Sequence, residues 1–320
     1  MNKRKQKTEK KRGEIHTHSW VISRKEFLKA SGGLVASLSL GNDSFAFPNK
    51  NDPSVLLRFG MVTDLHYAAR VPNGSRHYKE SLTKLKECVD LMNEKKVDFL
   101  IELGDFKDQQ KKATEKSSLS FLQRIEAVYS TFKGPRYHVL GNHDMDSLSK
   151  QQFLDRIENT GVDKGRSYYS FDSNGLHFVV LDANYKADGT SYDHGKFNWR
   201  DACLPKEELD WLKKDLTKTS KPVVVFVHQP IGFKKIHLFV INGEAVRQIL
   251  TESKKVLAVF QGHYHSGGYS YLEGIHYYTL KALVEGSGEK NNAYAIVEIH
   301  KNHNVGVTGY RRVADKIMPA

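Results

Sequence analysis

The stretch Val259–Gly268 reads VFQGHYHSGG and shows how this chain is organised. An apolar run, Val256–Phe260, gives way to a glycine at position 262, and His263 and His265 follow. A short apolar run bounded by a turn signal is typical of a buried strand. Imidazoles at the end of such a strand lose their hydration, and this costs free energy unless their nitrogen atoms bind a partner. The stretch therefore predicts a buried strand whose carboxyl end carries a binding site.

Four other apolar runs in the sequence end in the same way. The side chains that follow them are Asp64 and His66, Asp105, Asn142 and His143, and His228. A single Asp-x-His or Gly-Asp is common by chance and usually marks a turn. Five such endings in chain order are different, because α/β folds carry their sites at the carboxyl ends of the strands. The sequence therefore predicts one site assembled from all five endings.

The residue types of this set point to metal binding. Asp, His and Asn offer oxygen and nitrogen donors that suit Mn²⁺, Zn²⁺ or Fe, and the set holds no thiolate. Side chains two apart on a strand point the same way, so Asp64 with His66, and His263 with His265, are each expected to face a common centre. Seven donors exceed what one ion takes while keeping a position for water. Two divalent ions that share a carboxylate fit the number better.

Strand-like and helix-like segments alternate along the body of the chain. The expected strands are Val55–Val62, Val97–Leu103, Arg136–Leu140, Tyr168–Phe171, His177–Leu181, Pro222–Val227, Ile275–Leu280, Ala293–Ile299 and Val305–Tyr310. The expected helices are Tyr78–Lys96, Leu119–Phe132, Gln151–Ile157 and Glu207–Leu216. This alternation predicts an α/β domain with a hairpin turning at Ser173-Asn174-Gly175. The last three strands are expected to pair mostly antiparallel in a second sheet, and no linker divides residues 48–320, which we interpret as one domain.

Residues 1–47 differ from the rest of the chain and are interpreted as a leader. A polar, basic region precedes Ser23–Gly41, whose apolar part is about a dozen residues and too short to span a membrane. The order of basic, apolar and small residues is typical of an export signal. SRKEFLK, residues 23–29, resembles the twin-arginine signal, with Lys25 in place of the second arginine. We expect export to the periplasm or outside the cell; the alternative is a cytoplasmic enzyme with a basic tail.

Charge and cysteine content narrow the classes of partner. The formal net charge is +12, but residues 1–50 hold 11 Lys and Arg against 4 Asp and Glu, whereas the remainder holds 38 against 33. The body therefore lacks the dense basic stripe that specific nucleic-acid binding needs, although its mild positive charge suits an anionic small molecule. Two cysteines, Cys88 and Cys203, form no disulfide framework. Their pairing and the oligomeric state stay open.

The ordered motifs D-x-H, G-D-x-x-D, G-N-H-D, H and G-H-x-H resemble the calcineurin-like metallophosphoesterase superfamily over residues 57–266. The resemblance implies a four-layer α-β-β-α sandwich of two mixed sheets flanked by helices. It implies hydrolysis of phosphoesters by metal-bound hydroxide. The implied ligands are Asp64, His66, Asp105 and His265 for one ion, and Asp105, Asn142, His228 and His263 for the other. His143 would stabilise or protonate the leaving oxygen, Asp144 would orient its ring, and Asp108 would support the site.

Within that superfamily, three stretches are similar to the manganese-dependent ADP-ribose/CDP-alcohol diphosphatase group. They are Arg76–Leu82, Gly262–Ser270 and Gly309–Met318. The segment Ile231–Asn242 departs from the group's pattern. The resemblance implies Mn²⁺ as the favoured ion and a small nucleoside diphosphate-linked substrate.

Three further interpretations remain at this point. One is a phosphomonoesterase of broad specificity on the same metal core, and another is a nuclease or phosphodiesterase acting on nucleic acid. The third is a non-catalytic binding module that kept the fold. Tyr67, His77 and Tyr78 are candidates to line the substrate pocket and stack on a base, although buried aromatic side chains more often belong to the core.

Overall fold

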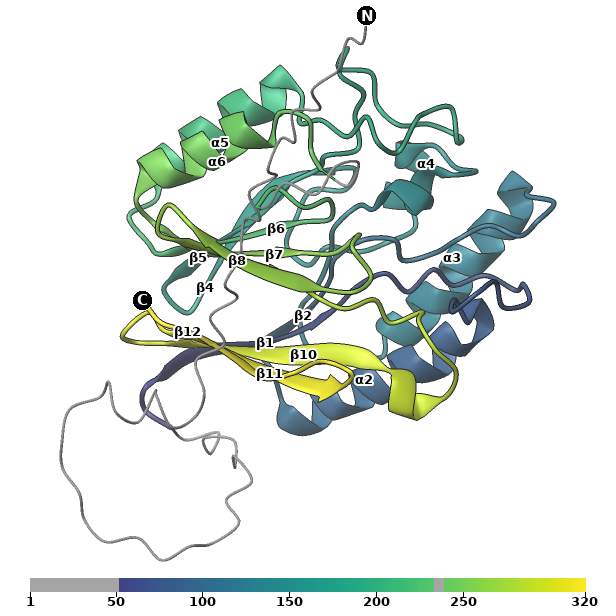
Figure 1. Ribbon diagram of the computed structural model, residues 1–320, viewed down its shortest axis with the longest axis horizontal. Coiled ribbons are helices and arrows are strands. Elements are labelled where there is room, and N and C mark those ends of the chain that lie inside the picture. The colour runs from purple at the N-terminus through teal and green to yellow at the C-terminus, as the bar shows by residue number, and fades with distance from the viewer. Residues whose placement is uncertain (1–51, 233–238) are drawn as a thin grey trace, which may run out of the picture. The chain divides into compact units, whose positions relative to one another are not determined.

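The computed structural model describes residues 52–232 and 239–320 (Figure 1). Residues Asn51–Ala320 form one compact unit. The expected leader, its export signal and the domain boundary between residues 47 and 48 lie outside the described residues. Among the described residues, no helix combines the length and the apolar character needed to cross a bilayer.

The first sheet has six strands and draws them from both ends of the described chain. Its order is β12-β11-β10-β1-β2-β3. The bounds are β1 (Val55–Val62), β2 (Phe99–Glu102), β3 (Arg136–His138), β10 (Ala293–His300), β11 (Val305–Arg311) and β12 (Lys316–Met318). Strands β1, β2 and β3 are parallel, whereas β10 pairs antiparallel with β1. The carboxyl ends of β1 to β3 therefore lie at one edge of the sheet.

The second sheet also has six strands, in the order β4-β5-β6-β7-β9-β8. The bounds are β4 (Tyr169–Ser173), β5 (Leu176–Val180), β6 (Val223–Val227), β7 (Val256–Gln261), β8 (Gly268–Leu272) and β9 (Ile275–Thr279). The four inner strands are parallel, and each edge strand is antiparallel to its neighbour. The predicted hairpin is confirmed: β4 and β5 meet at Asn174 and Gly175, which both have positive φ, as a two-residue hairpin turn requires.

Helices cover the outer faces of the two sheets, with the sheets facing each other between them (Figure 1). The bounds are α2 (Ser81–Lys95), α3 (Glu115–Tyr129), α4 (Lys150–Leu154), α5 (Lys206–Lys218) and α6 (Gly243–Ser253), with short 3-10 turns η1 (Tyr78–Glu80), η2 (Asn142–Met145) and η3 (Glu289–Asn291). Helices α2 and α3 lie on the first sheet and α5 and α6 on the second. The predicted α-β-β-α sandwich of two mixed sheets is confirmed.

Aromatic side chains fill the layer between the two sheets. Phe59 of the first sheet lies edge-on against Phe226 and Phe260 of the second, with ring centroids 5.5 Å and 5.6 Å apart. Phe99 stacks on Phe59 at 4.9 Å, and these rings are almost fully buried. Such pairs contribute about 0.5–1.5 kcal/mol each beyond the burial of their area. The sheets are therefore held at a fixed distance, and so are the loops at their edges.

The expectation for the last three strands was wrong in part. Of these segments, only β9 joins the sheet of β7, and it is parallel to β7. Strands β10, β11 and β12 return to the first sheet, where β10 pairs with the free edge of β1. The physical reason is that an alternating or apolar pattern identifies a strand, whereas its partner is decided by long-range packing. The segment of β10 gave no local sign that its partner lies at the other end of the chain.

Candidate functional site

The predicted donors converge at the carboxyl ends of strands from both sheets. Asp64, Asp105 and Asn142 follow β1, β2 and β3, respectively, in the first sheet. His228 follows β6 and His263 follows β7 in the second. The five strand endings thus lie at one place because the two sheets pack face to face with their parallel strands ending on the same side.

One group of donors consists of Asp64, His66 and His265, whose ligand atoms lie within 4.8 Å of one another. The Nε2 atoms of the two histidines are 3.1 Å apart. The Oδ1 atom of Asp64 lies 3.4 Å from Nε2 of His265 and 3.8 Å from Nε2 of His66. Asp64 and His66 are fully buried. Three donor atoms this close together could hold one metal ion.

A second group consists of Asp105, His228 and His263, which also lie within 4.8 Å of one another. Oδ2 of Asp105 is 3.2 Å from Nε2 of His228. The same oxygen is 3.5 Å from Nε2 of His66, which belongs to the first group. The carboxylate of Asp105 therefore lies between the two groups and contacts both.

The hydrogen bonds of the site show that its donors fit a cation. Two buried donor atoms, Asn142 Oδ1 and His263 Nε2, have no hydrogen-bond partner among the described residues. Asp64 Oδ1 and His228 Nε2 contact other donors of the site, at 3.4 Å and 3.2 Å. A buried polar atom without a partner costs about 1–3 kcal/mol. Divalent ions bind the oxygen and imidazole nitrogen atoms that remain unsatisfied here. The residues present therefore fit bound metal.

The donors are brought together by the backbone conformation of the loops, and not by the alternation of side chains along strands that the sequence predicted. Asp64, His66, Asp105 and His263 all have positive φ, between 47° and 66°. They lie in loops just past the strands, so strand alternation does not aim them. His263 and His265 belong to different groups, in agreement with the two ligand sets that the resemblance implied. Left-handed backbone at non-glycine residues is strained and is typical of functional sites.

Two motif glycines allow these loops to approach one another. A Cβ atom added at Gly141 would collide with the backbone nitrogen and the carboxylate of Asp105. One added at Gly262 would collide with the hydroxyl of Thr63 and crowd Asp64. The glycines of G-N-H-D and G-H-x-H are therefore explained by the close packing of neighbouring loops, since any side chain there would push the donors apart.

The second nitrogen of three histidine rings is held by a partner outside the two groups. His228 Nδ1 donates to the Leu103 carbonyl at 2.7 Å. His66 Nδ1 contacts Asp108 at 3.1 Å, and His265 Nδ1 contacts Glu285 at 2.6 Å. Such partners fix the ring orientation and leave Nε2 for the metal. Asp108 therefore supports the site as expected from the resemblance, whereas Glu285 was missed because no motif surrounds it in the sequence.

His143 and Asp144 lie beside the two groups, but Asp144 does not have the expected contact. Its carboxylate accepts backbone N–H bonds from Gly141, Asp105, Phe106 and Lys107, at 2.8–3.2 Å. Asp144 thus holds the loop of the G-D-x-x-D motif against the loop of the G-N-H-D motif. The carboxylate that contacts the His143 ring is Asp146, whose Oδ2 lies 2.7 Å from Nδ1. The contact with the His143 ring that was expected of Asp144 is therefore made by Asp146, which lies two residues later at the end of the short 3-10 turn. The G-N-H-D motif alone does not indicate this.

The electrostatic surroundings give the histidines different pKa values. Burial and the neighbouring His228 lower the pKa of His263 to about 3, so its ring is neutral and ready to act as a ligand. Burial also acts to lower the pKa of His143, but the carboxylates of Asp105 and Asp146 outweigh it and raise the pKa to about 10. His143 thus carries a proton in the metal-free site. So does His228, because burial acts to lower its pKa, but the carboxylate of Asp105 outweighs burial and raises the pKa of His228 to about 9.

The three residues expected to line the pocket lie near the site, but two of them are buried. Tyr67 is 3 % exposed and packs on Phe121, and Tyr78 is 2 % exposed beneath the Arg70 guanidinium. His77 contacts Glu80 at 3.0 Å. Little of either tyrosine ring is open to a ligand, so the structure does not favour a stacking role for them. They belong to the core beneath the site, which is the commoner place for aromatic side chains.

A family model described as calcineurin-like phosphoesterase matches residues 57–267, which is more than half of the chain and includes all seven predicted donors. The chain belongs to the calcineurin-like phosphoesterase family. It is therefore a metal-dependent phosphoester hydrolase, and the non-catalytic alternative loses its support.

Individual relatives of this phosphoesterase agree with the family assignment. A manganese-dependent ADP-ribose/CDP-alcohol diphosphatase from Oryza sativa subsp. japonica is 27% identical over 307 residues, covering 82% of this chain and 94% of the relative. The enzyme of the same name from Arabidopsis thaliana is 24% identical, covering 72% and 87%. A crystal structure of a dimetal phosphatase from Danio rerio superposes with a TM-score of 0.73 at 23% identity, covering 83% of this chain and 99% of that chain. The last comparison supports the fold.

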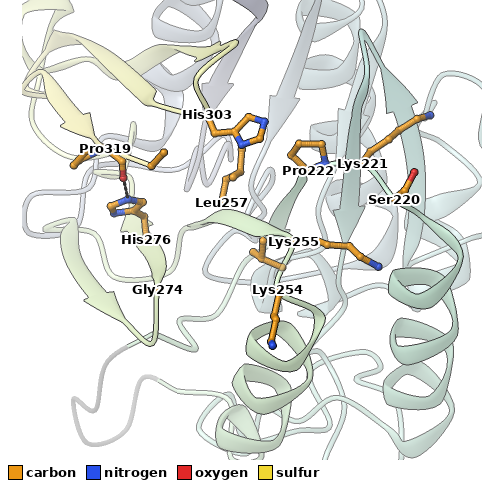
Figure 2. Close-up of a pocket in the computed structure, with 12 residues that line it drawn as sticks. Ser220, Lys221, Pro222, Lys254, Lys255, Leu257, Gly274, His276, His303 and Pro319 are labelled. Carbon is orange, nitrogen blue, oxygen red and sulfur yellow. Dashed lines mark hydrogen bonds between the residues drawn. The ribbon is translucent and has the colours of Figure 1, made fainter.

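A cavity of about 390 Å³ lies elsewhere on this phosphoesterase, at the opposite ends of β6 and β7 from the motif loops (Figure 2). Several of its polar lining groups already have partners. Lys221 contacts Asp172, and Lys255 donates to a backbone carbonyl. His276 contacts the Pro319 carbonyl, which is the hydrogen bond drawn in Figure 2. None of the predicted site residues lines this cavity, so the motif loops remain the candidate site.

Proposed function

We propose that this phosphoesterase uses a pair of divalent ions, Mn²⁺ by preference, to hydrolyse small nucleoside diphosphate-linked substrates. The observation that carries the proposal is the position of Asp105. Its Oδ2 contacts a histidine of each donor group, at 3.2 Å and 3.5 Å. A carboxylate shared between two sets of donors is the arrangement that a bridged pair of ions requires.

In this proposal each donor group holds one ion. Asp64, His66 and His265 hold the first, His228, His263 and Asn142 hold the second, and Asp105 serves both. When bound, the two ions lower the pKa of water toward about 7 and neutralise negative charge on the phosphoryl oxygens. The choice of Mn²⁺ is supported by the manganese dependence named for the relatives from rice and Arabidopsis.

His143 supplies the proton for the leaving oxygen. Its side chain is 28% exposed, so a substrate can reach it, and its ring centroid lies 4.7 Å from that of His66. The contact of Nδ1 with Asp146 fixes the ring and leaves Nε2 to meet the leaving group. A positioned general acid of this kind typically contributes a factor of about 10²–10⁴ to the rate.

The substrate class rests on the relatives, which hydrolyse ADP-ribose and CDP-alcohols by name. A phosphomonoesterase of broad specificity would use the same donors, so the two functions are separated by substrate and not by the site. The test uses metal-stripped full-length protein with Mn²⁺, Zn²⁺ and Mg²⁺ added back separately. ADP-ribose, CDP-choline and p-nitrophenyl phosphate are the substrates.

We expect turnover of the two diphosphates to exceed that of the monoester, with Mn²⁺ restoring the most activity. Preference for p-nitrophenyl phosphate would favour the monoesterase. Protein that takes up fewer than two equivalents of metal, or that is inactive on all three substrates, would overturn the proposal.

A further inference from the structure

The long loop between β5 and α5, residues 181–205, carries an exposed tryptophan next to the donor groups. Trp199 is 37 % exposed, and its ring centroid lies 5.7 Å from that of His263. Connections of this length inside a compact domain are uncommon and are usually functional. A large aromatic side chain that is partly exposed on such a loop does not gain the full free energy of burying its apolar surface. The position of Trp199 beside His263 therefore calls for an explanation.

The loop is ordered by contacts that fix the approach to Trp199. Tyr192 is fully buried, stacks on Phe197 with centroids 4.0 Å apart, and donates its hydroxyl to the Asn198 carbonyl at 3.1 Å. Gly195 donates its N–H to the Met145 carbonyl, which ties the loop to the turn that follows His143. The indole is thus held at the edge of the site by the loop itself.

Arg200 adds a positive charge to this aromatic surface. Its guanidinium carbon lies 4.8 Å from the centroid of the Trp199 ring. Among residues 52–232 and 239–320, no carboxylate lies within ion-pairing distance of Arg200. An indole with a guanidinium over its ring, and with no carboxylate partner for that guanidinium among the described residues, lies here at the margin of a phosphoester site. This pair matches a ligand that carries both an aromatic ring and anionic phosphate groups.

We propose that Trp199 and Arg200 form the subsite for the nucleobase of the substrate, with the indole stacking on the base. The inference rests on the proposed function and names the part of the substrate that this loop binds. Stacking is tolerant of base identity because every base has a π-face. One such surface therefore serves adenine and cytosine alike, the two bases in the substrates for which the rice and Arabidopsis relatives are named.

The test compares ligands that differ only in the base. AMP, CMP and ribose 5-phosphate each carry one phosphate, and the last has no base. Their inhibition constants are measured against the hydrolysis of ADP-ribose by four full-length, Mn²⁺-loaded proteins: wild type, Trp199→Phe, Trp199→Ala and Trp211→Phe. Trp211 is the matched control because it lies on α5 against Tyr168, with ring centroids 5.0 Å apart.

We expect Trp199→Ala to weaken inhibition by AMP and CMP on the order of tenfold, the size of about 1.4 kcal/mol of stacking. Ribose 5-phosphate should keep its affinity, and Trp199→Phe should keep most of the affinity for the nucleotides. AMP should also quench tryptophan fluorescence in wild type and in Trp211→Phe, and quench less in Trp199→Phe.

Two results would overturn the inference while leaving the proposed function standing. The first is an equal loss of affinity for all three ligands, which would mean that Trp199 only packs against His263. The second is unchanged affinity for all three. Failure of the proposed function is recognised separately, because it appears in the wild type alone, as a preference for p-nitrophenyl phosphate over the two diphosphates or as uptake of fewer than two equivalents of metal.

Discussion

Two carboxylates in the third motif loop show how much a contact depends on a single residue's place in a turn. Asp144 is fully buried and accepts backbone N–H groups, whereas Asp146 contacts the ring of His143. The sequence correctly placed Asp144 next to the site, because it follows an apolar run, but it did not single out Asp146. It could not decide between them, since the direction of each side chain is set by the 3-10 turn of Asn142–Met145.

Asp146→Asn should lower kcat by about tenfold to a hundredfold, because His143 loses the group that fixes its ring and keeps it charged. The loss should be larger for phenyl phosphate than for p-nitrophenyl phosphate, since a poor leaving group depends more on the proton. Asp146→Glu should recover part of the rate, and Asp163→Asn on the surface is the control. A loss of equal size on both substrates would contradict the role given to Asp146.

Asp105→Asn and His143→Ala should separate metal binding from proton transfer. Asp105 contacts both donor groups, so the amide should reduce bound metal below two equivalents per chain and abolish most activity. His143 belongs to the proposed proton path, so its alanine variant should keep the metal and lose about 10²-fold or more in rate. Metal content after dialysis and steady-state rates are the measurements. Full metal content in Asp105→Asn would contradict a shared carboxylate.

At the scale of elements, most strands and most helices could be predicted, whereas the edge strands β8 and β12 and the loops could not. Buried strands have a continuous apolar pattern, so β6 and β7 lie close to where the sequence indicates. The loop of Trp199 and the turn of Glu285 have mixed polar sequences, and their positions depend on contacts with distant residues. Helix α6 was missed because it adjoins the segment that departs from the relatives' pattern.

His177 links three of these elements and should make stability depend on pH. It lies on β5 and contacts Asp172 of β4 at 2.7 Å and Asp215 of α5 at 2.8 Å. Burial acts to lower the pKa of His177, but the two carboxylates outweigh it and raise the pKa. Lys221 also contacts Asp172 and partly offsets this effect. A raised folded-state pKa stabilises the protein below the unfolded value and ceases to do so as pH rises through the folded value.

His177→Gln should therefore destabilise the protein by about 1–2 kcal/mol near pH 6, where the histidine is charged in both states. The difference from wild type should shrink as the pH rises above about 6.5 and through the folded-state pKa. Urea unfolding at several pH values, with Mn²⁺ present throughout, measures this. A difference that grows with pH would show that His177 is neutral in the folded protein.

For the whole molecule, the α-β-β-α sandwich could be predicted because its motifs resemble one family. The sheet to which β10, β11 and β12 belong could not, because they join it through the pairing of β10 with β1, which spans most of the chain. The site lies where two sheets meet, and each sheet supplies donors. Any ion bound there connects the sheets, so metal and stability should be linked.

Removing the metal should lower the melting temperature, and adding Mn²⁺ back should raise it progressively with concentration. A ligand that binds only the folded state stabilises it by about 2.7 kcal/mol at a hundred times its Kd. Differential scanning calorimetry of stripped and loaded protein is the measurement, with Asp105→Asn as the variant that should respond least. Identical melting temperatures with and without Mn²⁺ would contradict a site that joins the sheets.

The place of β1 between β2 and β10 also has a consequence for how the protein is made. On the ribosome, Asp64 is translated early, whereas the strand that flanks β1 on its other side begins only at Ala293. A nascent chain therefore carries most of its donor residues long before the sheet that presents them is finished. We therefore expect metal uptake to follow the pairing of β10 with β1, so that a chain cut before Ala293 should bind less metal than one that contains β10.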